Sequence, residues 1–100
     1  MSAPSYDLVM IKKTFNCIAN LRMTGSARQG AVALGFTDQD VVDAIQALTL
    51  ADFFKTMPPV NKGFSAMHDV YKPCFKGGDL YIKFQVLSSG QLLLSFKHRW

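Results

Sequence analysis

The sequence predicts an α+β fold in which N-terminal helices pack on one face of a C-terminal antiparallel β-sheet. Apolar residues recur at helical spacing in the first half of the chain, whereas from residue 65 onward they alternate with polar residues, as they do in half-buried strands. Between the halves, Pro58-Pro59 and Asn61-Lys62-Gly63 mark turns or loop. The 100 residues have the length of one small domain, 1–100.

The first helix is expected over residues 6–21, because its apolar residues repeat at three- and four-residue spacing and so share one face. They are Leu8, Ile11, Phe15 and Ile18. After a short extended piece at 22–24, Ser26 is expected to cap a second helix that ends at Gly35, since glycine is usual just beyond a helix.

A third helix is predicted from Thr37, since Thr37 and Asp40 have the spacing of a capping box. Thr49 and Asp52 repeat that pattern just before the second half of the chain. The inward face of the third helix is expected to hold Val41, Ile45 and Leu48.

Three strands are predicted, over 65–72, 79–87 and 91–99, with Pro73 stopping the first and Lys76-Gly77-Gly78 forming a turn before the second. Phenylalanines in this half, Phe54 included, are mostly expected in the core. Alternation separates two faces of each later strand. Leu80, Ile82, Phe84 and Val86 oppose Tyr81, Lys83 and Gln85, and Leu92, Leu94 and Phe96 oppose Ser95, Lys97 and Arg99.

Ser88-Ser89-Gly90 fits a three-residue hairpin loop that pairs residue 87 with residue 91. In that register Tyr81 lies opposite Lys97, and Lys83 lies opposite Ser95. His68 and Lys72 share a face of the preceding strand by parity. The sequence leaves open whether their face is also the face of Tyr81 and Lys97.

All of the net charge of +4 lies in residues 51–100, because acids and bases balance in the first half. Basic and aromatic groups on one sheet surface are typical of proteins that contact a phosphate backbone, and RNA is the favoured partner. Any one of these lysines is also explained as a device for solubility and against aggregation.

Several classes of protein and site are not expected. No apolar run has the length of a membrane span, and the N-terminus lacks the features of a signal peptide, so a cytoplasmic location without membrane contact is expected. Cys17 and Cys74 should be free thiols. The four possible zinc ligands, Cys17, His68, Cys74 and His98, lack the close spacing of a zinc site, so no metal or other cofactor is expected. The chain has no Glu, which leaves little material for paired-carboxylate chemistry.

The histidine, lysine and tyrosine side chains of the predicted sheet suit RNA cleavage without a metal. Such a reaction needs a base for the 2′-hydroxyl proton, cations for the phosphate and an acid for the leaving 5′-oxygen. His68 suits either proton-transfer role, and lysines surrounded by other lysines can have lowered pKa values. Tyr81 could stack on a base or donate a hydrogen bond.

Four blocks of sequence resemble the MqsR toxin family in their order and spacing. They are Asp52-Phe53-Phe54-Lys55-Thr56-Met57, Asp69-Val70-Tyr71-Lys72-Pro73, Leu80-Tyr81-Ile82-Lys83 and Ser95-Phe96-Lys97. The resemblance implies a RelE-like α/β fold and a metal-independent endoribonuclease that cuts mRNA at short GC-containing sites such as GCU. It also implies the toxin of a type II toxin–antitoxin pair. An MqsA-like antitoxin is the implied partner, in a complex that represses the shared operon, and the toxin alone is expected to be monomeric.

Carried over residue by residue, the resemblance implies the catalytic positions Lys55, His68, Tyr81 and Lys97. The RNA-binding positions that we expect are Lys72, Met57, Lys83 and Arg99. One departure matters. A well-known member of the family has glutamine in place of His68, so the proton-transfer scheme can differ here. In addition, Lys72 replaces an arginine and Phe54 replaces a tyrosine.

Two other readings stay open. Residues 27–47 resemble a helix-turn-helix, but Asp38, Asp40 and Asp43 at its recognition helix would meet DNA phosphates with negative charge. A non-catalytic RNA-binding module could use the same basic sheet. Lys97→Ala or Tyr81→Phe separates the enzyme from the binder, because only an enzyme can lose far more cleavage than binding.

Overall fold

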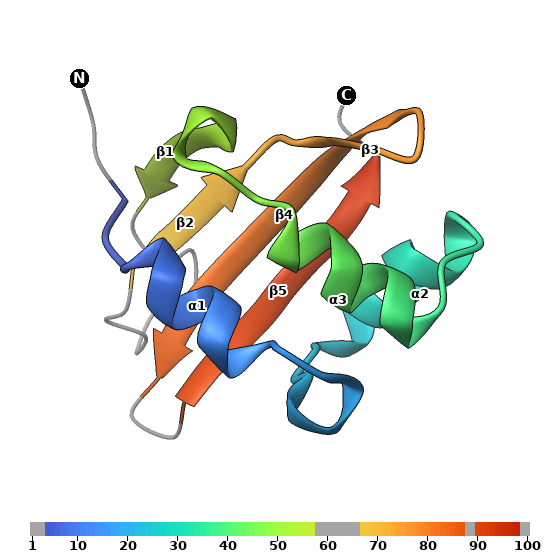
Figure 1. The fold of residues 1–100 in the computed structure, drawn as a ribbon, viewed down its shortest axis with the longest axis horizontal. Coiled ribbons are helices and arrows are strands. Elements are labelled where there is room, and N and C mark those ends of the chain that lie inside the picture. The colour runs from blue at the N-terminus through green and yellow to red at the C-terminus, as the bar shows by residue number, and fades with distance from the viewer. Residues whose placement is uncertain (1–3, 58–66, 88–89, 99–100) are drawn as a thin grey trace.

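The computed structural model describes residues 4–57, 67–87 and 90–98. Three α-helices from the first half lie on one face of an antiparallel sheet from the second half, which confirms the predicted α+β class (Figure 1). The helices are α1 (Leu8–Thr14), α2 (Gly25–Ala33) and α3 (Asp38–Gln46), with 3₁₀ turns η1 (Ile18–Asn20) and η2 (Leu50–Asp52). The strands are β1 (Phe53–Met57), β2 (His68–Tyr71), β3 (Cys74–Phe75), β4 (Gly78–Leu87) and β5 (Gly90–His98).

Helix α1 is shorter than the predicted helix 6–21. Leu8, Ile11 and Phe15 are buried as expected, but the chain leaves the helix at Phe15, and Ile18 is 46% exposed. The side-chain amide of Gln46, on α3, donates to the carbonyls of Lys12 and Phe15 at 2.7 and 3.0 Å. These bonds satisfy carbonyls that a helix end leaves without partners, so a contact distant in sequence stabilises this end of α1.

The cap of α2 also differs from the prediction. Thr24, rather than Ser26, is the N-cap, and its hydroxyl accepts from the Ala27 amide at 3.1 Å. The extended piece at 22–24 is confirmed, because Met23 bridges Leu93 of β5 and thereby fixes where the helix begins. Gly35 follows α2 with a φ of 76°, as expected of a glycine just beyond a helix.

Helix α3 follows its prediction closely. Thr37 and Asp40 form the complete capping box, and Val41, Ile45 and Leu48 are fully buried. Thr49 and Asp52 form a second box at η2, which leads directly into β1.

The sheet has the order β1-β2-β4-β5, and all of these pairs are antiparallel. Strand β3 pairs with β4 in the same register as β2, so β2 and β3 are two segments on one side of β4, separated by Lys72 and Pro73. The predicted turn is confirmed, since Lys76 and Gly77 both have positive φ and join β3 to β4. Residues 65 and 66 of the predicted strand lie outside the described residues.

The β4–β5 hairpin reaches its predicted register in an unexpected way. Leu87 pairs with Gly90 rather than with residue 91, and the register then shifts at Lys83/Phe84, where β5 has one extra residue. Tyr81 therefore faces Lys97 and Lys83 faces Ser95, as predicted. The shift also changes which residues of β5 point toward the core, so Leu93 is fully buried. Phe96 is buried as predicted, whereas the side chains of Leu92 and Leu94 lie outside the described part of the structure. Ser88 and Ser89 lie outside the described residues.

The core fills the space between the helices and the sheet. Asp69 is buried in this layer, where its carboxylate accepts from the amides of Ser5 and Tyr6 at 3.0 and 2.8 Å and so binds the N-terminal segment to β2. The Tyr71 hydroxyl is also buried but has no hydrogen-bond partner among the described residues. The largest fully buried side chains on this side of the sheet are Tyr71, Phe15, Phe84, Phe96, Ile11, Ile45, Leu48, Leu80, Ile82, Leu93 and Val41. Val70 is fully buried on the opposite face.

Helix α2 packs directly against β5, and Gly30 permits this contact. A Cβ atom at residue 30 would lie 1.9 Å from the carbonyl oxygen of Phe96, where no atom can fit without a shift of backbone. At Gly25, on the same helix, an added Cβ would meet no atom within 4 Å.

We predict that Gly30→Ala lowers the free energy of unfolding by about 2 kcal/mol, because α2 must move away from β5. Gly25→Ala is the matched control and should change it by less than about 0.5 kcal/mol. Urea denaturation followed by circular dichroism measures both variants. Equal stability of the two variants would contradict the close packing of α2 on β5.

A second prediction concerns the buried hydroxyl of Tyr71. Tyr71→Phe should leave the free energy of unfolding unchanged or raise it by up to about 1 kcal/mol, since the hydroxyl is buried without a hydrogen bond. Tyr6→Phe is the contrasting variant, because the Tyr6 hydroxyl donates to the Met67 carbonyl at 2.6 Å, and it should lower stability by about 1 kcal/mol. A clear loss of stability in Tyr71→Phe would show that this hydroxyl has a partner.

Candidate functional site

The sheet face opposite the helices carries most of the predicted site residues, and we call it the basic face. Strand pairing places them in three rows across the sheet. The rows are Met57, His68 and Gln85; Lys55, Val70, Lys83 and Ser95; and Tyr81 with Lys97. The question of whether His68 shares a face with Tyr81 and Lys97 is thereby answered, since β2 lies directly beside β4.

At one edge of the basic face, Lys55 and Lys72 meet at the ring of Phe54. The Lys72 Nζ lies 3.5 Å from the ring centroid and the Lys55 Nζ lies 5.3 Å from it. Phe54 is 46% exposed, so its expected place in the core is wrong. The pairing of β1 with β2 shifts between Phe53 and Lys55, and Phe53 takes the inward position against Tyr71. The sequence pattern FF gave no means of telling which phenylalanine would be exposed.

At the other edge, Tyr81 and Lys97 lie directly opposite each other on β4 and β5. The Lys97 Nζ is 5.3 Å from the centroid of the Tyr81 ring, which is within the range of a cation–π interaction. The ring thus holds the ammonium group at the surface, where an anionic ligand can reach it.

Lys83 lies between these two edges, half-buried in the middle of the sheet. Burial lowers the pKa of Lys83, and the positive charge of Lys97 lowers it further. Lys83 therefore releases its proton more readily than an ordinary surface lysine.

His68 is 8% exposed, on the strand beside Lys83. Burial lowers the pKa of His68, with a further contribution from the positive charge of Lys83. Its Nδ1 atom is buried and has no hydrogen-bond partner among the described residues. Both effects favour the neutral form of the imidazole.

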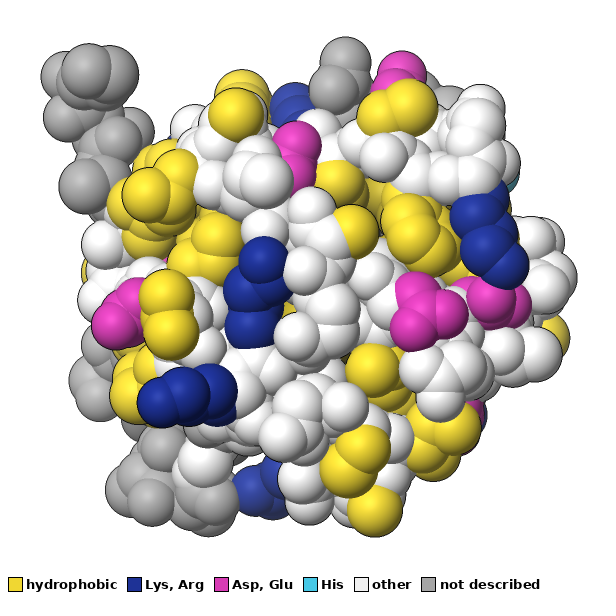
Figure 2. All heavy atoms as spheres, in the orientation of Figure 1, with side chains coloured by type: hydrophobic (Ala, Val, Ile, Leu, Met, Phe, Trp, Pro, Cys, Tyr) yellow, Lys and Arg dark blue, Asp and Glu magenta, His cyan; other side chains and the backbone are white. Residues whose placement is uncertain are grey.

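Few acids lie near these cations in the described part of the chain. Asp69 points to the opposite face, where it binds the N-terminal segment. Asp79 is on the same side of β4 as Lys83 but at the start of the strand. The helix-covered face differs, since basic, acidic and apolar side chains are mixed on it and two ion pairs join Arg28 to Asp38 and Lys76 to Asp40 (Figure 2).

The structure thus brings together seven of the eight predicted site residues, whereas Arg99 lies outside the described residues. Among residues 4–57, 67–87 and 90–98 there is no group of three metal-ligating His, Cys or Asp side chains. No helix in that part of the chain is long and apolar enough to cross a membrane.

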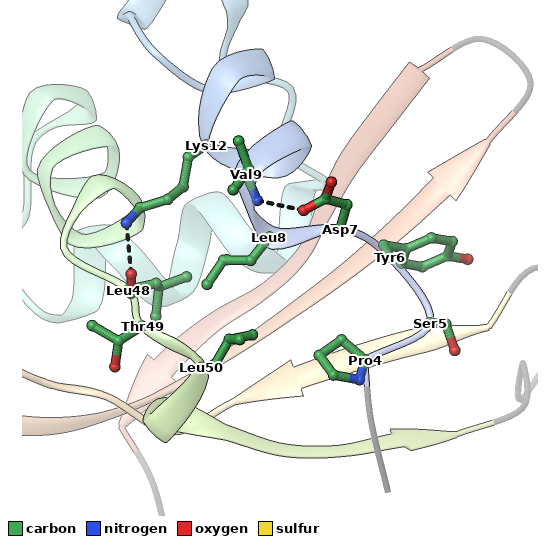
Figure 3. Close-up of a pocket in the computed structure, with 10 residues that line it drawn as sticks. All are labelled: Pro4, Ser5, Tyr6, Asp7, Leu8, Val9, Lys12, Leu48, Thr49 and Leu50. Atoms are coloured by element: carbon green, nitrogen blue, oxygen red, sulfur yellow. Dashed lines mark hydrogen bonds between the residues drawn. The ribbon is translucent and has the colours of Figure 1, made fainter.

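A groove of about 480 Å³ lies on the other side of the molecule, between the N-terminal segment, α1 and the loop after α3 (Figure 3). Its walls are largely apolar, with Pro4, Leu8 and Leu50 among them. Its two charged side chains have structural partners. Asp7 caps α1, and the Lys12 ammonium donates to the Leu48 carbonyl at 2.6 Å. The groups suited to phosphate chemistry are therefore on the basic face rather than in this groove.

Comparison with known proteins identifies the family of this chain. Residues 3–98 match the family described as "Motility quorum-sensing regulator, toxin of MqsA". The chain is also 31% identical over 96 residues to the mRNA interferase toxin MqsR of Escherichia coli (strain K12), with 96% of this chain and 95% of the relative covered. The chain belongs to the MqsR toxin family. The resemblance seen in the sequence is confirmed, and it extends over the helical half as well as the sheet.

The charge coupling across the basic face of this family member can be measured directly. We predict that Lys97→Ala raises the pKa of Lys83, because it removes a neighbouring positive charge that lowers it. NMR titration of the lysine side chains reports this pKa. Lys76→Ala is the control, since Lys76 pairs with Asp40 on the helix-covered side, and it should leave the pKa of Lys83 unchanged. An unchanged pKa in Lys97→Ala would contradict the coupling.

Proposed function

We propose that this protein is the toxin of a type II toxin–antitoxin pair and acts as an endoribonuclease on mRNA. The main support is the basic face, where Lys55, Lys72, Lys83 and Lys97 surround Tyr81 and His68. The E. coli relative is by name an mRNA interferase, which supports mRNA as the substrate of this protein. A surface of this kind attracts a phosphate backbone and orients one phosphate among several cations.

The reaction proposed is attack of the 2′-hydroxyl oxygen on the adjacent phosphorus. A new oxygen–phosphorus bond forms, the bond to the 5′-oxygen breaks, and the products are a 2′,3′-cyclic phosphate and a free 5′-hydroxyl. One group removes the 2′-hydroxyl proton, and another gives a proton to the 5′-oxygen. Lysine ammonium groups can stabilise the charge that develops on the phosphate, which is the basis for proposing a metal-independent reaction.

Each side chain has a proposed part in this scheme. Lys55, Lys72 and Lys97 hold the phosphate, with Met57 and Arg99 as further RNA contacts. Tyr81 positions the phosphate or donates a hydrogen bond to it. The sequence assigns proton transfer to His68, and Lys83 is the alternative, since its pKa is lowered and its side chain lies in the centre of the face.

The family membership supports two further parts of the proposal. The cleavage sites are expected to be short and GC-containing, such as GCU. The partner is expected to be an MqsA-like antitoxin, because the family description names a toxin of MqsA, and the complex is expected to repress its operon. The free toxin is proposed to be a monomer in the cytoplasm. The DNA-binding alternative is weaker, because α3 opens with Asp38 and Asp40 and buries Val41, Val42, Ala44 and Ile45.

The test is incubation of the purified protein with a defined mRNA in excess EDTA, followed by mapping of the cut ends. We expect discrete cuts with cyclic phosphate ends and a loss of at least about a hundredfold in cleavage rate for Lys97→Ala. Tyr81→Phe tests the tyrosine hydroxyl in the same assay. Lys76→Ala removes the same charge from the helix-covered side and should cleave normally.

Three results would contradict the proposal. Intact RNA that still binds the protein, with and without ribosomes, would favour the non-catalytic module. Cuts that persist equally in Lys97→Ala would place the activity elsewhere or in a contaminant. Cleavage abolished by EDTA and restored by a divalent cation would overturn the metal-independent scheme.

A further inference from the structure

We propose that His68 is a neutral hydrogen-bond donor, which binds a phosphate oxygen of the RNA through its Nε2–H and takes no part in proton transfer. The RNA ligand in this inference rests on the proposed function, whereas the protonation state of His68 follows from the structure alone. A donor role for His68 replaces the proton-transfer role that the sequence predicted for this residue.

The first observation is the position of the ring. His68 is more than nine-tenths buried, and its Nδ1 atom is enclosed without a hydrogen-bond partner among the described residues. Only Nε2 is therefore available to a ligand. A proton on Nδ1 would be a buried donor without an acceptor, a rare arrangement in folded proteins. The favoured tautomer therefore has its proton on Nε2 and an unprotonated Nδ1.

The second observation is the charge around the ring. On β2, the neighbouring Asp69 points to the opposite face and is engaged by the amides of Ser5 and Tyr6. On β1 and β4, Met57 and Gln85 lie directly opposite His68. The diagonal positions on those strands hold cations, Lys55 and Lys83, at roughly 7–8 Å in a regular sheet.

More distant charged groups on this face leave the surroundings of His68 positively charged. Lys72 and Lys97 add positive charge. Asp79 lies six residues along β4 from Gln85, which is about 20 Å in an extended strand. Tyr6 donates its hydroxyl proton to the Met67 carbonyl rather than to the ring. The described part of the chain thus has no carboxylate that could stabilise an imidazolium at residue 68.

These two observations argue against a proton-transfer role for His68. A histidine base becomes an imidazolium when it takes a proton, and a histidine acid must be one before it gives a proton. Histidines that do this are commonly oriented and stabilised by a carboxylate on the second nitrogen. In His68 the Nδ1 atom is instead buried without a hydrogen-bond partner among the described residues, and the neighbouring charges are positive. The direction of the shift in the pKa of His68 agrees with a neutral ring.

The neutral ring still serves an anionic ligand. Phosphate oxygens accept hydrogen bonds, so the single available N–H is matched to them. The side-chain amide of glutamine presents the same kind of neutral donor. His68→Gln therefore keeps the proposed interaction and removes any capacity for proton transfer at pH 5–8.

The protonation state is tested by ¹⁵N NMR of the imidazole nitrogens in the free protein. At pH 7 we expect His68 to show an unprotonated Nδ1 and a protonated Nε2. The chain has two histidines, so the signals that His68→Gln removes are assigned to His68 and the others to His98. An imidazolium, or the tautomer with the proton on Nδ1, would overturn the inference whether or not the protein cleaves RNA.

The role is tested by cleavage of the same mRNA in EDTA. His68→Gln should stay within about tenfold of the unmodified protein in kcat/KM, whereas His68→Ala should lose about tenfold to a hundredfold more, as expected for one hydrogen bond to a charged group. His98→Gln is the matched control and should cleave normally. Thermal unfolding of each variant confirms that it is folded.

The pH profile of kcat/KM gives the decisive comparison. The unmodified protein and His68→Gln should have profiles of the same shape between pH 5 and 8. An ionisation that disappears in His68→Gln, or an equal loss of a hundredfold or more in His68→Gln and His68→Ala with both folded, would overturn the inference. If the unmodified protein does not cleave RNA at all, the proposed function fails, and the NMR result alone decides the state of His68.

Discussion

The alternation of side chains along β4 is the constraint on which both the core and the basic face depend. Leu80, Ile82 and Phe84 are fully buried beneath the helices, so the residues between them must point to the other side of the sheet. Those residues include Tyr81 and Lys83. Strand β4 also pairs with β2, β3 and β5, and it therefore aligns the side chains that the neighbouring strands contribute. One strand thus determines where the core ends and where the candidate site begins.

Two register shifts adjust this arrangement. The shift in β5 turns Leu93 toward the core while it keeps Lys97 opposite Tyr81. The shift in β1 turns Phe53 inward and leaves Phe54 at the surface between two lysines. Bulges commonly redirect side chains beside functional sites. In this protein both of them bring an aromatic ring and an ammonium group together on the basic face.

Hydrophobic periodicity and helix-capping patterns were sufficient to predict much of the fold from the sequence. The capping box at Thr37, the alternation of β4 and the pairing of Tyr81 with Lys97 could be predicted because each depends on residues close in sequence or on a single hairpin. The end of α1, the cap at Thr24 and the exposure of Phe54 could not, since each depends on a contact with a distant strand or helix. The candidate site was found through the resemblance and the charge pattern together. The sequence alone did not show that His68 is buried with an unpartnered nitrogen.

The crowding of lysines on the basic face has a consequence for the stability of the fold itself. Folding brings Lys83 and Lys97 together and partly buries the former, so the folded chain holds an electrostatic strain that the unfolded chain does not have. That strain is fully present while both side chains are protonated, and it decreases as the pH rises through the lowered pKa of Lys83. A bound polyanion would relieve it at constant pH. The complex with the polyanion would then be more stable toward unfolding than the free protein, in which the repulsion between Lys83 and Lys97 is uncompensated.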